Sequence, residues 1–208
     1  MLNHKSHQIG FSVLAVLGAA VSAVLAADFP DKAFDATYEM GGPLGNSTMR
    51  LLSDGQGHTR QEVTAANSGY KVVTITDYPK KTAVNLMVEQ KMAIRMPFKP
   101  STTHEVMDET TAKEHGATAL GVKVIDGHPC HGWQYSTGNQ LNEVWSGDDI
   151  GNIVYSVQKS PQGQITMKLN KYSSNAPAAE VFSVPSDFQF IQVPEAFPQG
   201  KDQSIKLK

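Results

Sequence analysis

Much of the chain alternates apolar and polar residues over short runs, a pattern that predicts β-strands, because successive side chains of a strand point to opposite faces. Two such runs lie next to each other and share their apolar residues as follows: Val84, Leu86 and Val88 in the first, and Met92, Ile94, Met96 and Phe98 in the second. If residues 89–91 form a three-residue loop, Val88 lies opposite Met92. The two apolar rows then share one side of a hairpin.

A second hairpin is predicted around residues 160–163, Ser-Pro-Gln-Gly, which combine a proline suited to a type I turn with a glycine suited to a left-handed bulge. This loop places Val157 opposite Met167 and Tyr155 opposite Leu169. The apolar residues of the two strands would then form one continuous face.

A third hairpin is predicted at residues 126–127, where Asp-Gly is a two-residue turn signal. The turn pairs Val122 with His131 and Leu120 with Trp133.

One segment of the mature chain predicts a helix. It begins at Thr102 with Glu105 as a capping box and ends before Gly116. Its few apolar residues indicate that it lies on a sheet surface. Long antiparallel strands with one helix predict a mainly β fold, a strongly curved antiparallel sheet or open half-barrel with one covering helix. Such a sheet has an apolar interior where an apolar ligand can bind.

The length of 208 residues fits one domain. Residues 1–27 combine a weakly basic start, an apolar run and small residues, so we expect a cleaved secretory signal peptide. No cysteine lies near the cleavage point, which excludes lipidation there. We expect a single half-barrel domain over 28–197, a mobile polar tail over 198–208 and a periplasmic location.

The net charge of −2 argues against a nucleic-acid partner. The chain has no nucleophile elbow, zinc-protease motif, phosphate loop or dinucleotide fingerprint, so we expect neither an enzyme nor a cofactor. The single cysteine, Cys130, lies between His128 and His131. These residues suggest a soft-metal site for copper(I). A strand would place His131 on the face opposite His128 and Cys130, so a buried thiol without metal is the stronger interpretation.

Several other residues have both a structural and a ligand-binding interpretation. Thioether side chains suit either an irregular core or the lining of a variable apolar site, and they are found at Met87, Met92, Met96 and Met107. Arginines on strands are usually surface residues, yet at a cavity mouth they could pair with a phosphate or carboxylate; they are Arg50, Arg60 and Arg95.

The order of short motifs along residues 35–190 resembles the LolA-like superfamily of periplasmic lipoprotein carriers. The motifs are Met49-Arg50 before an Asp-Gly turn, Leu120 to Gly127, then Cys130, Trp133 and Tyr135, Val144-Trp145-Ser146, and Val181 to Phe188. The resemblance implies an open half-barrel with a helical lid and, in the best understood members of the superfamily, binding of acyl chains of lipoproteins. No segment assigns this chain to the true carrier as opposed to its relatives, so the specific cargo does not carry over.

Together these observations predict an exported, non-enzymatic protein that binds a lipid, an acylated protein or another apolar ligand, with possible transient contact to the membrane or an envelope protein. The predicted ligand-lining residues are Val84, Leu86, Val88, Met92, Ile94, Met96, Phe98, Met107, Trp133 and Tyr135. Two alternatives are an envelope interaction or sensing module without a ligand, and a copper-binding protein.

Overall fold

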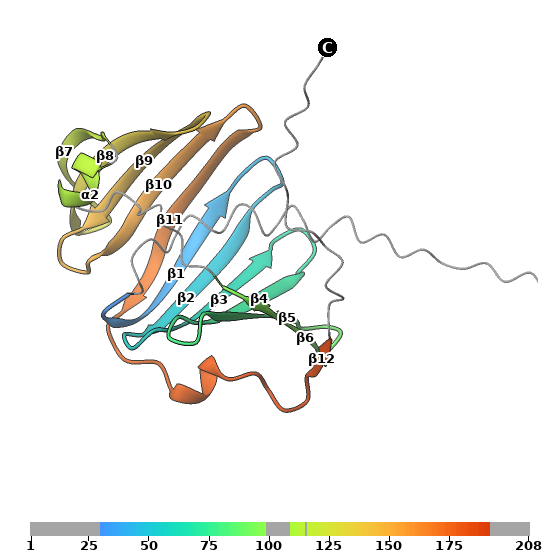
Figure 1. Cartoon of the computed structure of the whole chain (residues 1–208). Coiled ribbons are helices and arrows are strands. Elements are labelled where there is room, and N and C mark those ends of the chain that lie inside the picture. The colour runs from blue at the N-terminus through green and yellow to red at the C-terminus, as the bar shows by residue number, and fades with distance from the viewer. Residues whose placement is uncertain (1–29, 99–108, 115, 192–208) are drawn as a thin grey trace, which may run out of the picture.

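The computed structural model describes residues 30–98, 109–114 and 116–191, which form one 12-stranded sheet (Figure 1). The strands are β1 (Ala33–Gly41), β2 (Ser47–Asp54), β3 (His58–Ala65), β4 (Lys71–Asp77), β5 (Thr82–Met87), β6 (Met92–Pro97), β7 (Thr118–Ile125), β8 (His128–Thr137), β9 (Gln140–Gly147), β10 (Asn152–Ser160), β11 (Gly163–Ser173) and β12 (Gln189–Ile191). The described part also contains a helix, α2 (Glu109–Glu114), and a 3-10 turn, η2 (Ala179–Phe182). The expected signal peptide and polar tail lie outside the described residues.

The strands follow the order β12-β6-β5-β4-β3-β2-β1-β11-β10-β9-β8-β7. All neighbours are antiparallel except β12, which runs parallel to β6. The pairing of β1 with β11 joins the two halves, and the sheet curves without closing, so the predicted mainly β half-barrel is confirmed (Figure 1).

One face of the sheet, the inner face, carries the largest fully buried side chains. Tyr38, Met49 and Leu51 are 0%, 0% and 1% exposed. Tyr38 lies opposite Met49 on the next strand, and Met49 opposite Val63 on the strand after that. Side chains from β1, β2, β3 and β8 to β11 join in one cluster, the main core, which also includes Cys130 and Trp145 from the other face of β8 and β9.

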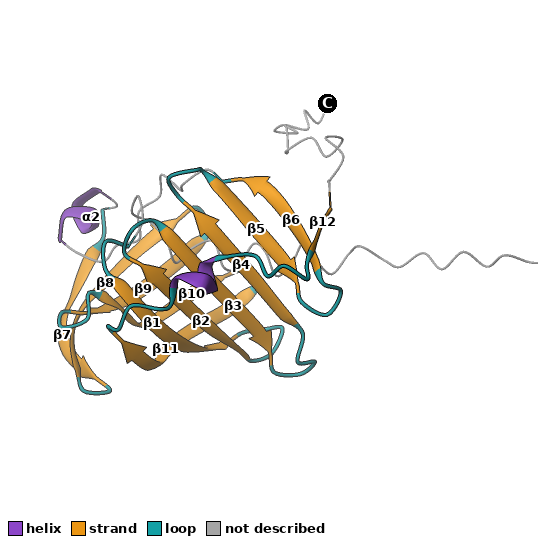
Figure 2. Cartoon of the chain, turned by 90° about the horizontal axis from the view of Figure 1, so that it is seen from below, coloured by secondary structure: helices purple, strands orange, loops and turns teal. Residues whose placement is uncertain are grey.

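The other face, the outer face, is covered on β3 to β6 by the chain that follows β11. Val184 and Phe188 of this chain pack on a second apolar cluster. The cluster consists of Val73, Ile75, Val84, Leu86 and Ala93. Figure 2 shows η2 lying across the sheet near β3, where Arg60 Nη1 donates a hydrogen bond to the Val181 carbonyl at 3.1 Å.

The hairpin at residues 126–127 has the predicted turn. Asp126 and Gly127 have φ of 48° and 91°, the left-handed conformations of a type I′ turn. Val122 pairs with His131 as expected, whereas a bulge at Leu120 leaves Ala119 opposite Trp133.

The predicted register of the hairpin at residues 160–163 is wrong by one residue. Ser160 pairs with Gly163, so Val157 lies opposite Thr166 and not Met167. Pro43 packs so closely on Gly163 that a β-carbon would not fit there, and Gly163 stays in the strand instead of forming a bulge. A slip of one residue moves a strand's side chains to the other face, which separates Met167 from Val157.

The predicted register between β5 and β6 is also wrong. Met87 lies opposite Met92, so the loop comprises four residues, 88–91. Lys91, with φ of 52°, closes this turn by donating its amide to the Val88 carbonyl. Met92 and Ile94 consequently lie on the face opposite Val84 and Leu86.

The predicted helix is present as α2, while its expected start at Thr102 lies outside the described residues. Ala112 of α2 is 2% exposed and belongs to the main core cluster. No helix in the described part of the chain is both long and apolar enough to span a bilayer.

Candidate functional site

The inner face of β8 and β9 brings together two of the predicted ligand-lining residues. Trp133 and Tyr135 lie two residues apart on β8, opposite Val144 and Asn142 of β9. Ser146, opposite His131, continues the same face by strand alternation. We call Trp133, Tyr135, Val144 and Ser146 the β8–β9 site.

Two polar atoms of the β8–β9 site are buried without a hydrogen-bond partner in the described structure: the indole Nε1 of Trp133 and the hydroxyl Oγ of Ser146. Ser146 is only 7% exposed. A buried donor without a partner costs about 1–3 kcal/mol, so two on one face are unusual for a purely structural core.

The inner face continues from this site to an exposed sheet edge, and between the two it carries the exposed His131, which is paired with Asp148. On the edge strand β7, Val122 and Val124 are 64% and 69% exposed, and Val122 pairs with His131 of β8. Ala119 of the same strand lies opposite Trp133. Ala119, Val122 and Val124 therefore form an apolar strip along the edge strand, which meets the tryptophan at Ala119 and borders His131 at Val122.

The other predicted lining residues are divided between the two faces. Val84 and Leu86 belong to the outer-face cluster, with Val88 packed against it. Met92, Ile94 and Met96 take the inner face, opposite Met87, Asn85 and Ala83 of β5. Phe98 packs on Tyr78 with ring centroids 4.9 Å apart. Met107 lies outside the described residues.

A cleft of about 230 Å³ on the outer face lies between β2, β3 and the chain around η2, and it includes Arg50 and Arg60. Both arginines already have carboxylate partners, since Arg50 binds Asp35 in a bidentate pair at 2.6 and 2.9 Å and Arg60 binds Glu62 at 2.6 Å. Burial alone would raise the pKa of Glu62, but hydrogen bonds from Lys71 and Arg60 outweigh it and lower that pKa. The paired charges leave no excess positive charge for an anion among the described residues of the cleft.

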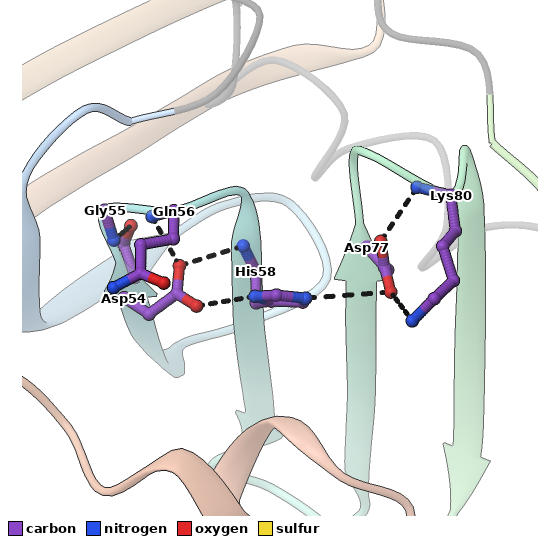
Figure 3. Close-up of polar contacts among 7 residues, drawn as sticks. Asp54, Gly55, Gln56, His58, Asp77 and Lys80 are labelled. Atoms are coloured by element: carbon purple, nitrogen blue, oxygen red, sulfur yellow. Dashed lines mark hydrogen bonds and ion pairs between the residues drawn. The ribbon is translucent and has the colours of Figure 1, made fainter.

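Each of the three described histidines pairs with an aspartate. In Figure 3, His58 lies between the β2–β3 turn and β4, with Nδ1 2.5 Å from Asp54 Oδ2 and Nε2 3.7 Å from Asp77 Oδ2. Burial tends to raise the pKa of Asp54, whereas hydrogen bonds from the amides of His58 and Gln56 and from the His58 ring lower it overall. These contacts tie two neighbouring turns together at one end of the sheet.

The histidines beside Cys130 are held apart by the turn between β9 and β10. His128 Nδ1 lies 2.8 Å from Asp149 Oδ2, and His131 Nδ1 lies 2.6 Å from Asp148 Oδ1. Cys130 is fully buried and its Sγ donates to the His128 carbonyl at 3.2 Å. Burial raises the pKa of the Cys130 thiol, which disfavours the thiolate needed for metal binding or nucleophilic attack.

Among the residues that the structure describes, no group of three or more His, Cys, Asp or Glu side chains is placed to hold a metal ion. The predicted split of His128 and Cys130 from His131 agrees with the register, in which alternate residues of β8 face opposite ways.

Neither a role for Ser146, which appears in the sequence only within the motif Val144-Trp145-Ser146, nor the histidine–aspartate pairs was predicted. Ser146 had one usable signal, its place two residues after Val144 in the same strand, which puts both side chains on one face. The pairs at His128 and His131 had none, because their partners are 21 and 17 residues away.

A family profile described as "Domain of unknown function (DUF4412)" matches residues 37–155 of the chain. The match covers β2 to β9 completely and ends within β10. No curated protein sequence matches the chain significantly.

Several solved structures are similar in fold. An uncharacterised conserved protein from Thermus thermophilus is 12% identical, with a TM-score of 0.59 over 77% of this chain and 90% of that one. A chain of the Pseudomonas aeruginosa MucA/MucB complex is 17% identical, with a TM-score of 0.52 over 85% of this chain and 65% of that one. Our chain therefore spans slightly less than two thirds of that protein.

A LolA superfamily protein from Nitrosomonas europaea also matches, at 8% identity and a TM-score of 0.37 over 78% of this chain and 93% of that one. The LolA-like half-barrel that the sequence resemblance implied is confirmed as the fold of this chain, because its sheet is open and strongly curved.

Proposed function

The chain belongs to the DUF4412 family, a family of unknown function, and from that premise we propose that it is a non-enzymatic binding protein that holds an acyl chain or another apolar ligand on its inner face. The observation that carries the proposal is the apolar strip from the exposed edge of β7 to the β8–β9 site. Val122 and Val124 are more than 60% exposed on this strip, and exposed apolar side chains that adjoin a core often mark a binding surface.

Burial of these valines against an acyl chain gives the binding free energy a physical source. Removal of apolar surface from water contributes about 25 cal/mol per Å². The edge position also leaves an entry route, because Val122 and Val124 are exposed to solvent.

The proposal includes export to the periplasm, which rests on residues 1–27. Cleavage after Ala26 or Ala27 is the expected processing event. N-terminal sequencing of the protein recovered from a periplasmic extract tests this: a start at residue 27 or 28 supports export, and recovery of the intact chain in the cytoplasm contradicts it.

Binding is tested with the purified full chain, stripped of co-purifying lipid, and a BODIPY-labelled methyl palmitate. We expect saturable uptake, weakened about tenfold by the double variant Val122→Ser/Val124→Ser, because about 1.4 kcal/mol of apolar contact is lost. Leu44→Ser is the matched control, since Leu44 is 75% exposed in a loop remote from the strip. Absence of uptake by the unaltered chain would refute the proposal.

A second function is favoured by the backbone of the same strand. Within the described sheet, β7 pairs only with β8 and is the last strand, so its other side can add a strand from a protein partner. A similar fold occurs in the MucA/MucB complex. Crosslinking of a photoreactive residue at position 122 to a specific envelope protein, without lipid uptake, would favour this function over ligand binding.

A further inference from the structure

We propose that Trp133 and Ser146 together bind the carbonyl oxygen of the ligand, which makes the ligand a neutral acyl ester or amide and not a bare hydrocarbon or a free fatty acid. This inference rests on the proposed function, because it names the chemical class bound at the same site.

The register places both donors on the same side of neighbouring strands. Trp133 lies opposite Val144, and Ser146 lies two residues further along β9, opposite His131. Diagonal neighbours of this kind are about 7–8 Å apart at their backbones, within reach of a long aromatic side chain. The indole N–H and the hydroxyl can therefore approach one common acceptor.

The number of donors matches the chemistry of a carbonyl. A carbonyl oxygen has two lone pairs and accepts two hydrogen bonds, whereas an indole N–H has no other capacity than to donate. Trp133 Nε1 and Ser146 Oγ are buried without partners in the described part of the chain. A ligand that supplies one carbonyl oxygen satisfies both atoms at once, and a hydrocarbon satisfies neither.

The surrounding charge favours a neutral group over a carboxylate. Asp148 and Asp149 follow Ser146 closely in the chain, and His131, opposite Ser146, is already paired with Asp148 at 2.6 Å. The nearby Lys123 lies over the ring of Trp145, on the outer face.

The rest of the ligand would lie along apolar surface already described. Tyr135 and Val144 are 8% and 2% exposed beside the donors, and Val122 and Val124 continue the surface to the edge. The carbonyl would thus sit at the inner end of the strip, with the alkyl chain directed toward β7.

Nuclear magnetic resonance gives a direct test, because the full chain contains two tryptophans and hence two indole N–H signals. Trp145 Nε1 already donates to Glu143 Oε1 at 2.7 Å and provides an internal reference. The probes are methyl dodecanoate, dodecanoate and dodecane. We expect methyl dodecanoate alone to move the Trp133 signal downfield, while the Trp145 signal stays in place.

Affinities of the three probes are measured by displacement of the fluorescent ester. Ser146→Ala and Trp133→Phe are each expected to weaken methyl dodecanoate about three- to tenfold, the effect of one lost hydrogen bond, and to leave dodecane unchanged. Ser136→Ala, on the same strand as Trp133 but on the outer face, is the matched control and should change neither.

The outcomes separate the two proposals. If no probe binds, the proposed function fails and the inference fails with it. If all three probes bind with equal affinity and the Trp133 signal does not move, the function stands and the inference is overturned. The inference is also overturned if Ser146→Ala leaves ester binding unchanged, since the two donors would then serve only an ordered water.

Discussion

The ring of Trp145 lies directly over Gly132 on the neighbouring strand, so closely that a β-carbon at Gly132 would be 2.5 to 2.6 Å from three ring atoms. On the same ring, Lys123 Nζ lies 3.5 Å from the centroid. Glycine at position 132 therefore creates the space that lets an aromatic side chain lie flat on the outer face.

Replacement of Gly132 by alanine should destabilise the protein by about 1–3 kcal/mol, because the ring of Trp145 has to move out of a well-packed position. Urea unfolding followed by tryptophan fluorescence measures the change in free energy. Gly42→Ala is the control, since its nearest atom would be at an ordinary contact distance of 3.6 Å. Equal stability of the two variants would show that the ring moves freely.

Two buried serines at strand positions should respond oppositely to removal of the hydroxyl. Ser53 Oγ accepts a hydrogen bond from the Gly55 amide at 3.0 Å, whereas Ser146 Oγ has no partner in the described structure. Ser53→Ala should cost about 1 kcal/mol, because the partly buried Gly55 amide loses its acceptor. Ser146→Ala, measured without ligand, should leave the melting temperature unchanged or raise it. A clear loss of stability in Ser146→Ala would mean that its hydroxyl is satisfied in solution.

Acid should weaken the link between the β2–β3 and β4–β5 turns. The pKa of Asp54 is lowered in the folded protein, so its contribution to stability is complete above the ordinary carboxyl pKa and is lost as pH falls through the lowered value. Urea unfolding between about pH 6 and pH 2 should therefore show a smaller acid-induced loss for Asp54→Asn than for the unaltered chain.

The control for that titration is Asp187→Asn. Asp187 also has a lowered pKa, caused by its hydrogen bond from Lys91, but the pair is exposed and screened by solvent. Its pH profile should stay close to that of the unaltered chain. An Asp54→Asn profile that also matches the unaltered chain would contradict the proposed contribution of the Asp54 carboxylate to stability.

The thiol of Cys130 should be unreactive in the folded protein. The side chain is 0% exposed and burial raises its pKa, so both access and thiolate formation are suppressed. A disulfide reagent such as Ellman's reagent at about pH 8 should label the chain only at the rate of its opening, and rapidly in denaturing urea. Fast labelling under native conditions would contradict the described packing.

The curved sheet could be predicted from the sequence, because apolar and polar residues alternate along most of its strands. Registers could be predicted only where the turn chemistry allowed a single loop length. The Asp126-Gly127 turn, which needs two left-handed residues, gave the right pairing of Val122 with His131. The loop before Met92 allowed three or four residues, and the difference of one residue exchanged the faces of a whole strand.

Part of the candidate site could be predicted, because that part depends only on alternation within one strand. Trp133 and Tyr135 share a face by alternation within one strand, which needs no knowledge of the neighbouring strands. Val84 and Leu86 were assigned to the interior, but Val184 and Phe188 cover them from the outer side. That cover comes from a segment about 100 residues further along the chain, and no local pattern predicts it.

The two borders of the described sheet differ in a way that limits how copies of this protein can associate. One border ends in β12, a strand of three residues, while the other ends in the eight residues of β7. A molecule whose sheet has one long unpaired edge strand can pair that edge with one neighbour. No second edge of similar length then remains. Edge-to-edge pairing through β7 would therefore stop at a dimer, whereas two long edges would permit an open-ended sheet of many copies.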